Sequence, residues 1–262
     1  ADCDFVIEAV FEELEVKRQV FGELEQVVSA DCVLATNTSS LSVTEMASGL
    51  RNPERLVGVH FFNPVALMPL VEIVRHDETE DEALATAWDV VKKLRKRGVV
   101  VGDAPGFVVN RVLTRMSRSL MDAIEHGTPT DVADQAILRL GLPMAPSVLV
   151  QMVGPRVANH VLETMHDAFP DRFPLSPALA ALADGREPEP LAHEPRTWER
   201  VQADALDAMA DEIAHLLDEG VVADKADVDA CMLLGAGFPF FLGGITPYLE
   251  QQGHLPAASK VR

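Results

Sequence analysis

Short apolar runs alternate with stretches of helical periodicity over residues 4–103, and this alternation limits the possible folds more than any other feature of the sequence. Between the first two runs, Leu24 and Val27 lie one helical turn beyond Val20 and Phe21, so that all four share one face of a helix. Such alternation favours a parallel sheet covered by helices. The predicted strands are residues 5–9, 32–36, 56–61, 70–74 and 99–101.

A second helix of this half is predicted over residues 81–97, because Thr79 and Glu82 match the spacing of a capping box. The chain opens at Ala1 and passes almost at once into the apolar run of residues 5–7. A buried parallel strand needs a neighbour on each side. We therefore expect further strands of this sheet to precede Ala1 in the native protein.

After Pro105 and Gly106 the sequence predicts helices only. A long amphipathic helix carries apolar residues from Val109 to Ile124 and stops at Gly127, since glycine is the common residue just past a helix end. The other predicted elements are helices over 131–140 and 148–169, the second bent at 154–155, and a Pro-rich, charged linker over 184–195.

The helical half repeats itself. Residues 131–143 align without a gap on residues 227–239, each starting Asp-Val and ending Gly-x-Pro. Upstream, Met116 and Gly127 fall on Met209 and Gly220 at an offset three residues shorter. The combination favours duplication of one small helical module over coincidence.

Composition excludes several classes of protein. The net charge of −19 opposes binding to a phosphate backbone. The longest apolar runs fall far short of the roughly 20 residues that cross a bilayer. Three widely separated cysteines and no recognisable leader favour a reducing, cytoplasmic setting.

One segment carries most of the chemical information. His60 ends an apolar run before an Asn-Pro turn that begins at Asn63, and open α/β sheets bind ligands at such strand ends. Glu72 lies on the next apolar run, where burying an unpaired carboxylate is costly. Paired with Glu72, the imidazole could act as a general base. From spacing alone, a core histidine and a half-exposed glutamate are the preferred interpretation.

Four motifs change that preference. The motifs are Asn37-Thr-Ser-Ser40, His60-Phe-Phe-Asn-Pro64, Leu70-Val-Glu72 and Pro105-Gly-Phe-Val-Val-Asn-Arg111. Their order and spacing resemble those of the 3-hydroxyacyl-CoA dehydrogenases. The resemblance extends over essentially the whole chain. It implies an α/β fold with a partial Rossmann-like parallel sheet, followed by an all-α domain of two tandem modules. Two modules in tandem are similar to the multifunctional α-subunits of fatty-acid oxidation complexes, which implies an acyl-CoA substrate and possible association with a thiolase subunit.

The resemblance also assigns roles. His60 would remove the 3-hydroxyl proton while hydride passes to NAD, and Glu72 would orient the imidazole. Ser39 and Asn110 resemble the substrate-binding residues. Without the resemblance, both are better explained as helix-start side chains, Glu12 as a helix-start acid, and Lys17 as a solvated lysine. The residues that resemble the family's cofactor contacts are Val10, Phe11, Glu12, Lys17, Asn37, Ser39 and Asn63, and no metal site is expected.

One expected motif is absent from the sequence. No Gly-x-Gly-x-x-Gly follows a strand, so the loop that binds the pyrophosphate of NAD is expected ahead of Ala1. The predicted domains are residues 1–103, the C-terminal part of an NAD-binding domain, and two helical modules, 104–185 and 196–262. An alternative function is a non-catalytic helical assembly module of the same complex. Calorimetric titration with NAD separates the two hypotheses.

Overall fold

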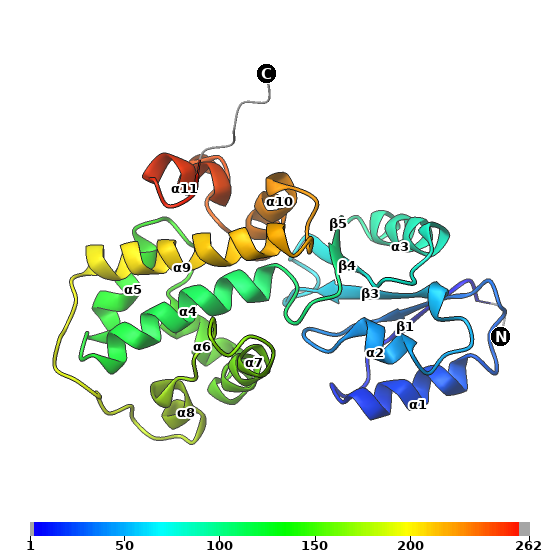
Figure 1. Ribbon diagram of the computed structural model, residues 1–262, viewed down its shortest axis with the longest axis horizontal. Coiled ribbons are helices and arrows are strands. Elements are labelled where there is room, and N and C mark those ends of the chain that lie inside the picture. The colour runs from blue at the N-terminus through cyan, green and yellow to red at the C-terminus, as the bar shows by residue number, and fades with distance from the viewer. Residues whose placement is uncertain (1–2, 257–262) are drawn as a thin grey trace. The chain divides into compact units, whose positions relative to one another are not determined.

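The computed structural model describes residues 3–256, which form two compact units (Figure 1). The first unit extends to Val108 and also contains Glu219–Gly235. The second contains Val109–Asp218 and the described residues from Ala236 onward. The chain therefore returns once to the first unit after entering the second.

A five-stranded sheet forms the centre of the first unit, with its strands in the order of the sequence. The first three strands and the last pair run parallel to their neighbours, whereas β3 and β4 are antiparallel. The strands are β1 (Phe5–Glu8), β2 (Val33–Thr36), β3 (Leu56–Phe61), β4 (Leu70–Arg75) and β5 (Arg97–Gly102).

The reversal at β4 corrects the expectation of a wholly parallel sheet. Only residues 62–69 join β3 to β4, and a crossover between parallel strands needs about a dozen residues or more. The short connection therefore returns β4 beside β3 in the opposite direction. As a result, the end of β3 and the beginning of β4 lie at the same edge of the sheet.

Helices cover both faces of this sheet. Helix α3 (Asp81–Lys93) places Ala83, Ala87 and Val91 against alternate apolar residues of β2, β3 and β4. On the other side, α2 (Val43–Ala47) contacts β3, and α10 (Lys225–Gly235) contacts β4 and β5. The remaining helices of this unit are α1 (Leu14–Leu24), packed against α2, and the 3₁₀ turn η1 (Pro53–Arg55).

The predicted second helix is shorter than expected and lacks the predicted capping box. It ends at Lys93, and β5 begins at Arg97 after Arg95 adopts a positive φ of 59°. The Thr79 hydroxyl accepts a hydrogen bond from the His76 N–H and donates to the Leu56 carbonyl. The hydroxyl is therefore used by the preceding turn, and the residue at the helix N-cap is Glu80.

The second unit is helical throughout its described part. Its longest helices, α4 (Val109–Glu125) and α9 (Trp198–Asp218), pack together. The predicted bend at Gly154 is confirmed as a break with a φ of 98°. The other elements are α5 (Thr130–Leu138), α6 (Pro146–Val153), α7 (Pro155–Ala168), α8 (Pro177–Ala183), η2 (Phe240–Leu242) and α11 (Ile245–Gln252).

A buried ion pair joins α4 to α9. Arg111 and Glu212 are fully buried, and the Arg111 Nε donates to a Glu212 carboxylate oxygen at 2.5 Å. The Phe169 ring lies under two guanidinium groups, 4.8 Å from Arg111 and 3.9 Å from Arg172. The charges at this helix interface are thus compensated by an acid and by an aromatic face.

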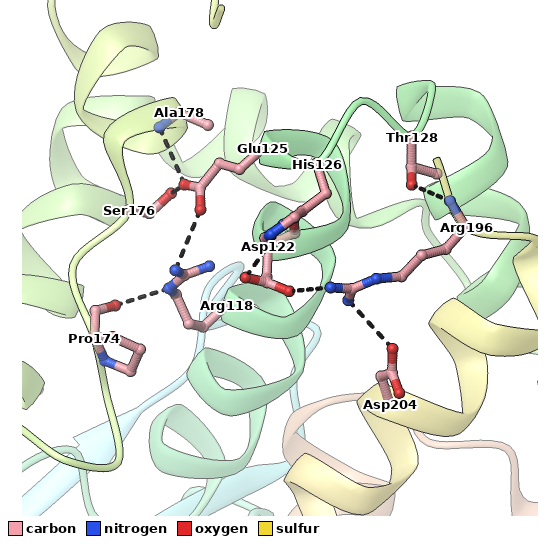
Figure 2. A network of polar contacts seen from close by, with 10 residues as sticks. All are labelled: Arg118, Asp122, Glu125, His126, Thr128, Pro174, Ser176, Ala178, Arg196 and Asp204. Atoms are coloured by element: carbon pink, nitrogen blue, oxygen red, sulfur yellow. Dashed lines mark hydrogen bonds and ion pairs between the residues drawn. The ribbon is translucent and has the colours of Figure 1, made fainter. Parts of the chain in front are cut away.

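The predicted linker is tied to the end of α4. The Leu191 N–H and Glu194 N–H donate to the carbonyls of Glu125 and His126. Figure 2 shows how Arg196 then bridges two helices, with its guanidinium 2.7 Å from Asp122 on α4 and 3.2 Å from Asp204 on α9. The segment is therefore an ordered connection held against the helices, not a linker without contacts.

The duplicated modules do not occupy equivalent places. Helices α4 and α5 recur as α9 and α10, as the sequence repeat predicts. However, α5 packs against α9 and belongs to the helical unit, whereas α10 packs on the sheet. The compact units therefore divide the predicted second module, 196–262, between them. Within the described residues, no helix is long and apolar enough to cross a membrane.

Candidate active site

The centre of the candidate site is a histidine-glutamate pair. His60 is the fifth residue of β3 and lies directly opposite Glu72 of β4 in the antiparallel register. Opposed residues in such a pair project their side chains to the same face. The His60 Nδ1 and a Glu72 carboxylate oxygen are 2.7 Å apart, and both residues are buried, at 4% and 0% exposure.

Surrounding groups hold this pair in place. The second carboxylate oxygen of Glu72 accepts a hydrogen bond from the Val108 N–H at 3.2 Å. The imidazole lies 4.5 Å from the Phe62 ring and 5.6 Å from the Phe107 ring. With Nδ1 donating its hydrogen to Glu72, Nε2 carries the lone pair and is the basic nitrogen.

Helix α10 contributes a thiol near the pair. Cys231 is fully buried on this helix. Burial raises the pKa of the Cys231 thiol, and the negative charge of Glu72 raises it further. The thiol therefore stays protonated beside Glu72 and adds no charge to the site.

A second polar cluster lies at the same edge, where β1 and β2 end. Glu8, the last residue of β1, is 4% exposed and accepts hydrogen bonds on both carboxylate oxygens. Its donors are the Lys17 ammonium at 2.8 and 3.0 Å, the Thr36 hydroxyl at 2.7 Å and the Val10 N–H at 2.6 Å. The ammonium also donates to the Asn37 carbonyl at 3.2 Å.

Glu12 extends this cluster to the loop after β2. One of its oxygens accepts hydrogen bonds from the Thr38 hydroxyl at 2.6 Å and from the Ser39 N–H at 2.9 Å. Its other oxygen lies 3.4 Å from the Lys17 ammonium. Ser39 is exposed and does not cap α2, because Ser42 occupies that position.

The structure thus brings five of the predicted residues together around Glu8, a residue that the sequence prediction missed. They are Val10, Glu12, Lys17, Asn37 and Ser39. A signal for Glu8 was present, because a carboxylate closing an apolar strand is costly to bury without a partner. The interpretation of Lys17 as a solvated lysine is wrong, since its side chain is fully buried.

The other predicted site residues lie outside these two clusters. Phe11 is 81% exposed just after β1, and Asn63 is exposed in the turn after β3. Asn110 lies in the first turn of α4, in the helical unit. The groups at the sheet edge nevertheless suit a dinucleotide, because carboxylate oxygens accept hydrogen bonds from ribose hydroxyls and exposed apolar side chains cover ring faces.

Comparison with known proteins agrees with this geometry. Residues 1–104 match the 3-hydroxyacyl-CoA dehydrogenase NAD binding domain, and residues 106–189 match the C-terminal domain of the same enzymes. The chain is similar to the fatty acid oxidation complex subunit alpha of Psychrobacter arcticus, with 34% identity over 97% of this chain and 40% of that protein. The corresponding subunit of Idiomarina loihiensis is 36% identical over 96% of this chain and 40% of its own length.

Solved structures show the same relationship. The crystal structure of FadB2 from M. tuberculosis is 35% identical with a TM-score of 0.66, covering 75% of this chain and 71% of that chain. The 3-hydroxybutyryl-CoA dehydrogenase of Escherichia coli shares the fold with a TM-score of 0.80, at 24% identity over 97% of this chain and 78% of its own.

The two matched domains, an α/β unit and a helical unit, are those of the dehydrogenase class of oxidoreductases. The chain belongs to the 3-hydroxyacyl-CoA dehydrogenase family, whose cofactor is NAD. It spans 40% of the length of the α-subunits that it matches.

Proposed function

We propose that this protein oxidises (S)-3-hydroxyacyl-CoA to 3-oxoacyl-CoA with NAD in fatty-acid oxidation. The observation that carries the proposal is the 2.7 Å contact between His60 and Glu72, buried at the edge of the sheet where ligands bind. Such a pair is suited to removing a proton from a hydroxyl group.

In this mechanism, the His60 Nε2 accepts the proton of the substrate's 3-hydroxyl as the C3 hydride leaves. NAD, when bound, supplies the acceptor for that hydride. The imidazole becomes positively charged, and the Glu72 carboxylate stabilises that charge at Nδ1. A positioned general base contributes roughly 10²- to 10⁴-fold to the rate.

The remaining residues would bind the two ligands. Ser39 and Asn110 are proposed to bind the substrate oxygen, and Ser39 is also proposed to contact the cofactor. Val10, Phe11, Glu12, Lys17, Asn37 and Asn63 are proposed to hold NAD. The cluster around Glu8 supports this assignment for the residues that it fixes, because a pre-organised polar group loses less entropy on binding.

The names of the relatives suggest which proteins this chain assembles with. The fatty acid oxidation proteins that this chain resembles are named as α-subunits of a complex. We propose that the protein takes part in a multifunctional complex with a thiolase subunit. A cytoplasmic location remains a prediction from composition.

Enantiomer discrimination tests the proposed reaction. The protein, NAD and either (S)- or (R)-3-hydroxybutyryl-CoA are mixed, and NADH formation is followed by absorbance. We expect NADH with the (S) substrate only. Equal rates with both enantiomers, or none with either although calorimetry shows NAD bound, would contradict the proposed reaction. Absence of NAD binding would instead favour the assembly module.

A further inference from the structure

Three donor groups from three segments of the chain make four hydrogen bonds to the Glu8 carboxylate: one from the residues after β1, two from helix α1 and one from the end of β2. Building on the proposed function, we propose that Glu8 is a positioning residue for the cofactor. Its carboxylate fixes the Lys17 ammonium and the Val10 N–H, and through Lys17 it reaches the Asn37 carbonyl. It thereby sets the affinity for NAD without taking part in proton or hydride transfer.

The geometry around the Lys17 ammonium supports this role. An ammonium group has three donors. Glu8 at 2.8 Å and the Asn37 carbonyl at 3.2 Å hold the ammonium inside the unit, and the Glu12 carboxylate lies farther away, at 3.4 Å. The Glu12 side chain is 36% exposed, whereas those of Glu8 and Lys17 are fully buried. Among the contacts of the ammonium, the one with Glu12 is therefore the one that lies nearest to solvent.

Glu8 also shapes the backbone on which Glu12 acts. The Val10 N–H bond fixes the chain that leaves β1 towards Glu12. The Glu8 carbonyl accepts a hydrogen bond from the Asn37 N–H at 2.9 Å, which fixes the loop after β2. Glu12 then holds that loop at Thr38 and Ser39. The main-chain bond to Asn37 does not depend on the Glu8 side chain. Loss of the Glu8 charge should therefore loosen the segment after β1 directly, and the loop after β2 through Lys17 and its contacts with Asn37 and Glu12.

A second buried ion pair in the same unit provides a matched control. Glu25 lies 3.3 Å from Arg55, and their side chains are 7% and 8% exposed. Arg55 donates to the Ser29 and Ala30 carbonyls, which precede β2, so this pair lies at the opposite edge of the sheet. Breaking either pair leaves a buried charge without its partner and destabilises the fold, but only Glu8 lies at the cofactor edge.

The experiment compares Glu8→Gln with Glu25→Gln in the whole protein. NAD affinity is measured by calorimetry, kcat and KM by NADH formation, and stability by urea unfolding. We expect Glu8→Gln to weaken NAD binding roughly 10- to 100-fold, the range for one charge-assisted hydrogen bond, with kcat at saturating NAD retained. Glu25→Gln should lose stability yet bind NAD normally. Glu8→Asp, which keeps the charge, should recover part of the affinity.

Amide hydrogen exchange gives a readout that needs no bound cofactor. In Glu8→Gln, exchange should accelerate at Val10, whose N–H donates to the carboxylate, and at Ser39, whose partner Glu12 contacts Lys17. In Glu25→Gln it should stay unchanged at both amides. Normal NAD affinity in Glu8→Gln, equal loss in both variants, or unchanged exchange at these amides would overturn the positioning role. A wild-type protein that binds NAD but forms no NADH would overturn the proposed reaction alone, and one that binds no NAD would overturn both.

Discussion

The imidazole of His60 and the carboxylate of Glu72 face each other directly across β3 and β4, 2.7 Å apart and shielded from solvent. The contact depends on the antiparallel register, because a shift of one residue would turn Glu72 to the other face of the sheet. The chemistry of the site is therefore tied to the short connection that reverses β4.

Replacing Glu72 by Gln should distinguish two effects of this side chain on His60, the orientation of the imidazole and the stabilisation of its positive charge. The amide oxygen of glutamine can still accept the His60 Nδ1–H, but it cannot neutralise an imidazolium. We expect kcat to fall by roughly 10²-fold, with the dissociation constants of NAD and acyl-CoA unchanged. Steady-state kinetics and calorimetry on the same preparation measure both. Turnover equal to that of the wild type would show that the charge of Glu72 is not used.

Gly58 lies in β3, the strand that carries His60, and the structure leaves little room there for a side chain. A Cβ at this position of β3 would lie 2.6 Å from the Val74 Cβ and 3.1 Å from the Val43 Cγ2. Gly58→Ala should therefore cost about 1–3 kcal/mol of unfolding free energy. Adding Val74→Ala removes the Cγ2 atom, 2.8 Å away, but leaves the Cβ contact, so it should recover little of this cost.

The control for Gly58 is Gly22 in α1, where an added Cβ meets no atom within 4 Å. Gly22→Ala should be neutral or should stabilise the protein by about 0.5–1 kcal/mol, because alanine favours the helix. Urea unfolding measures all four proteins. A Gly58→Ala variant as stable as Gly22→Ala would show that the strand shifts without cost.

Glu25 should make stability depend on acid pH. Burial acts to raise its pKa, but hydrogen bonds from the Arg51 and Asn52 N–H groups and from the Arg55 guanidinium outweigh burial and lower the pKa below its ordinary 4.5. A carboxyl group whose pKa is lower in the folded than in the unfolded protein stabilises the fold at pH values above its unfolded-state pKa. This stabilisation is lost as the pH falls through the folded-state pKa.

The corresponding measurement is unfolding of the wild type and Glu25→Gln over a pH series. The wild type should have the higher unfolding free energy at neutral pH, and the difference in unfolding free energy between the two proteins should narrow below pH 4.5. A difference in unfolding free energy that stays constant down to the lowest pH tested would show that titration of the Glu25 carboxylate is not coupled to folding.

The three cysteines should differ in reactivity. Burial, together with the neighbouring Cys3 thiol, raises the pKa of Cys32 to about 11, and burial raises that of Cys231. Cys3 is partly exposed. Because the thiolate is the reactive form, a disulfide reagent at mildly alkaline pH should label Cys3 alone in the folded protein and all three in denaturant. Rapid labelling of the Cys3→Ser variant would contradict the assignment.

The sequence predicted the strands, most helices and the contact between His60 and Glu72, because hydrophobic periodicity and strand-end position are local properties. The direction of β4 was not predicted, since an apolar run such as residues 70–74 reads the same in either orientation. The position of α10 was missed for a similar reason. Its repeat identifies it as a copy of α5 but does not determine that it packs on the sheet.

Within the site, residues were predicted from motifs and their partners were not. Lys17 matched a family position, yet its buried ammonium is held by Glu8 at the end of β1 and by Asn37 just after β2. Long-range convergence of this kind leaves no fixed spacing in the sequence. The structure was needed to show that the Glu8 carboxylate binds Val10 and Lys17 directly and, through Lys17, is connected to Asn37 and Glu12.

Turnover of His60→Ala is the most direct test of the account. With saturating NAD and (S)-3-hydroxyacyl-CoA, kcat should fall at least about 100-fold, while the dissociation constant of the acyl-CoA, measured by calorimetry, stays at the wild-type value. An affinity for acyl-CoA that falls as far as turnover does, or a kcat close to that of the wild type, would make His60 a structural residue and contradict the proposed catalytic base.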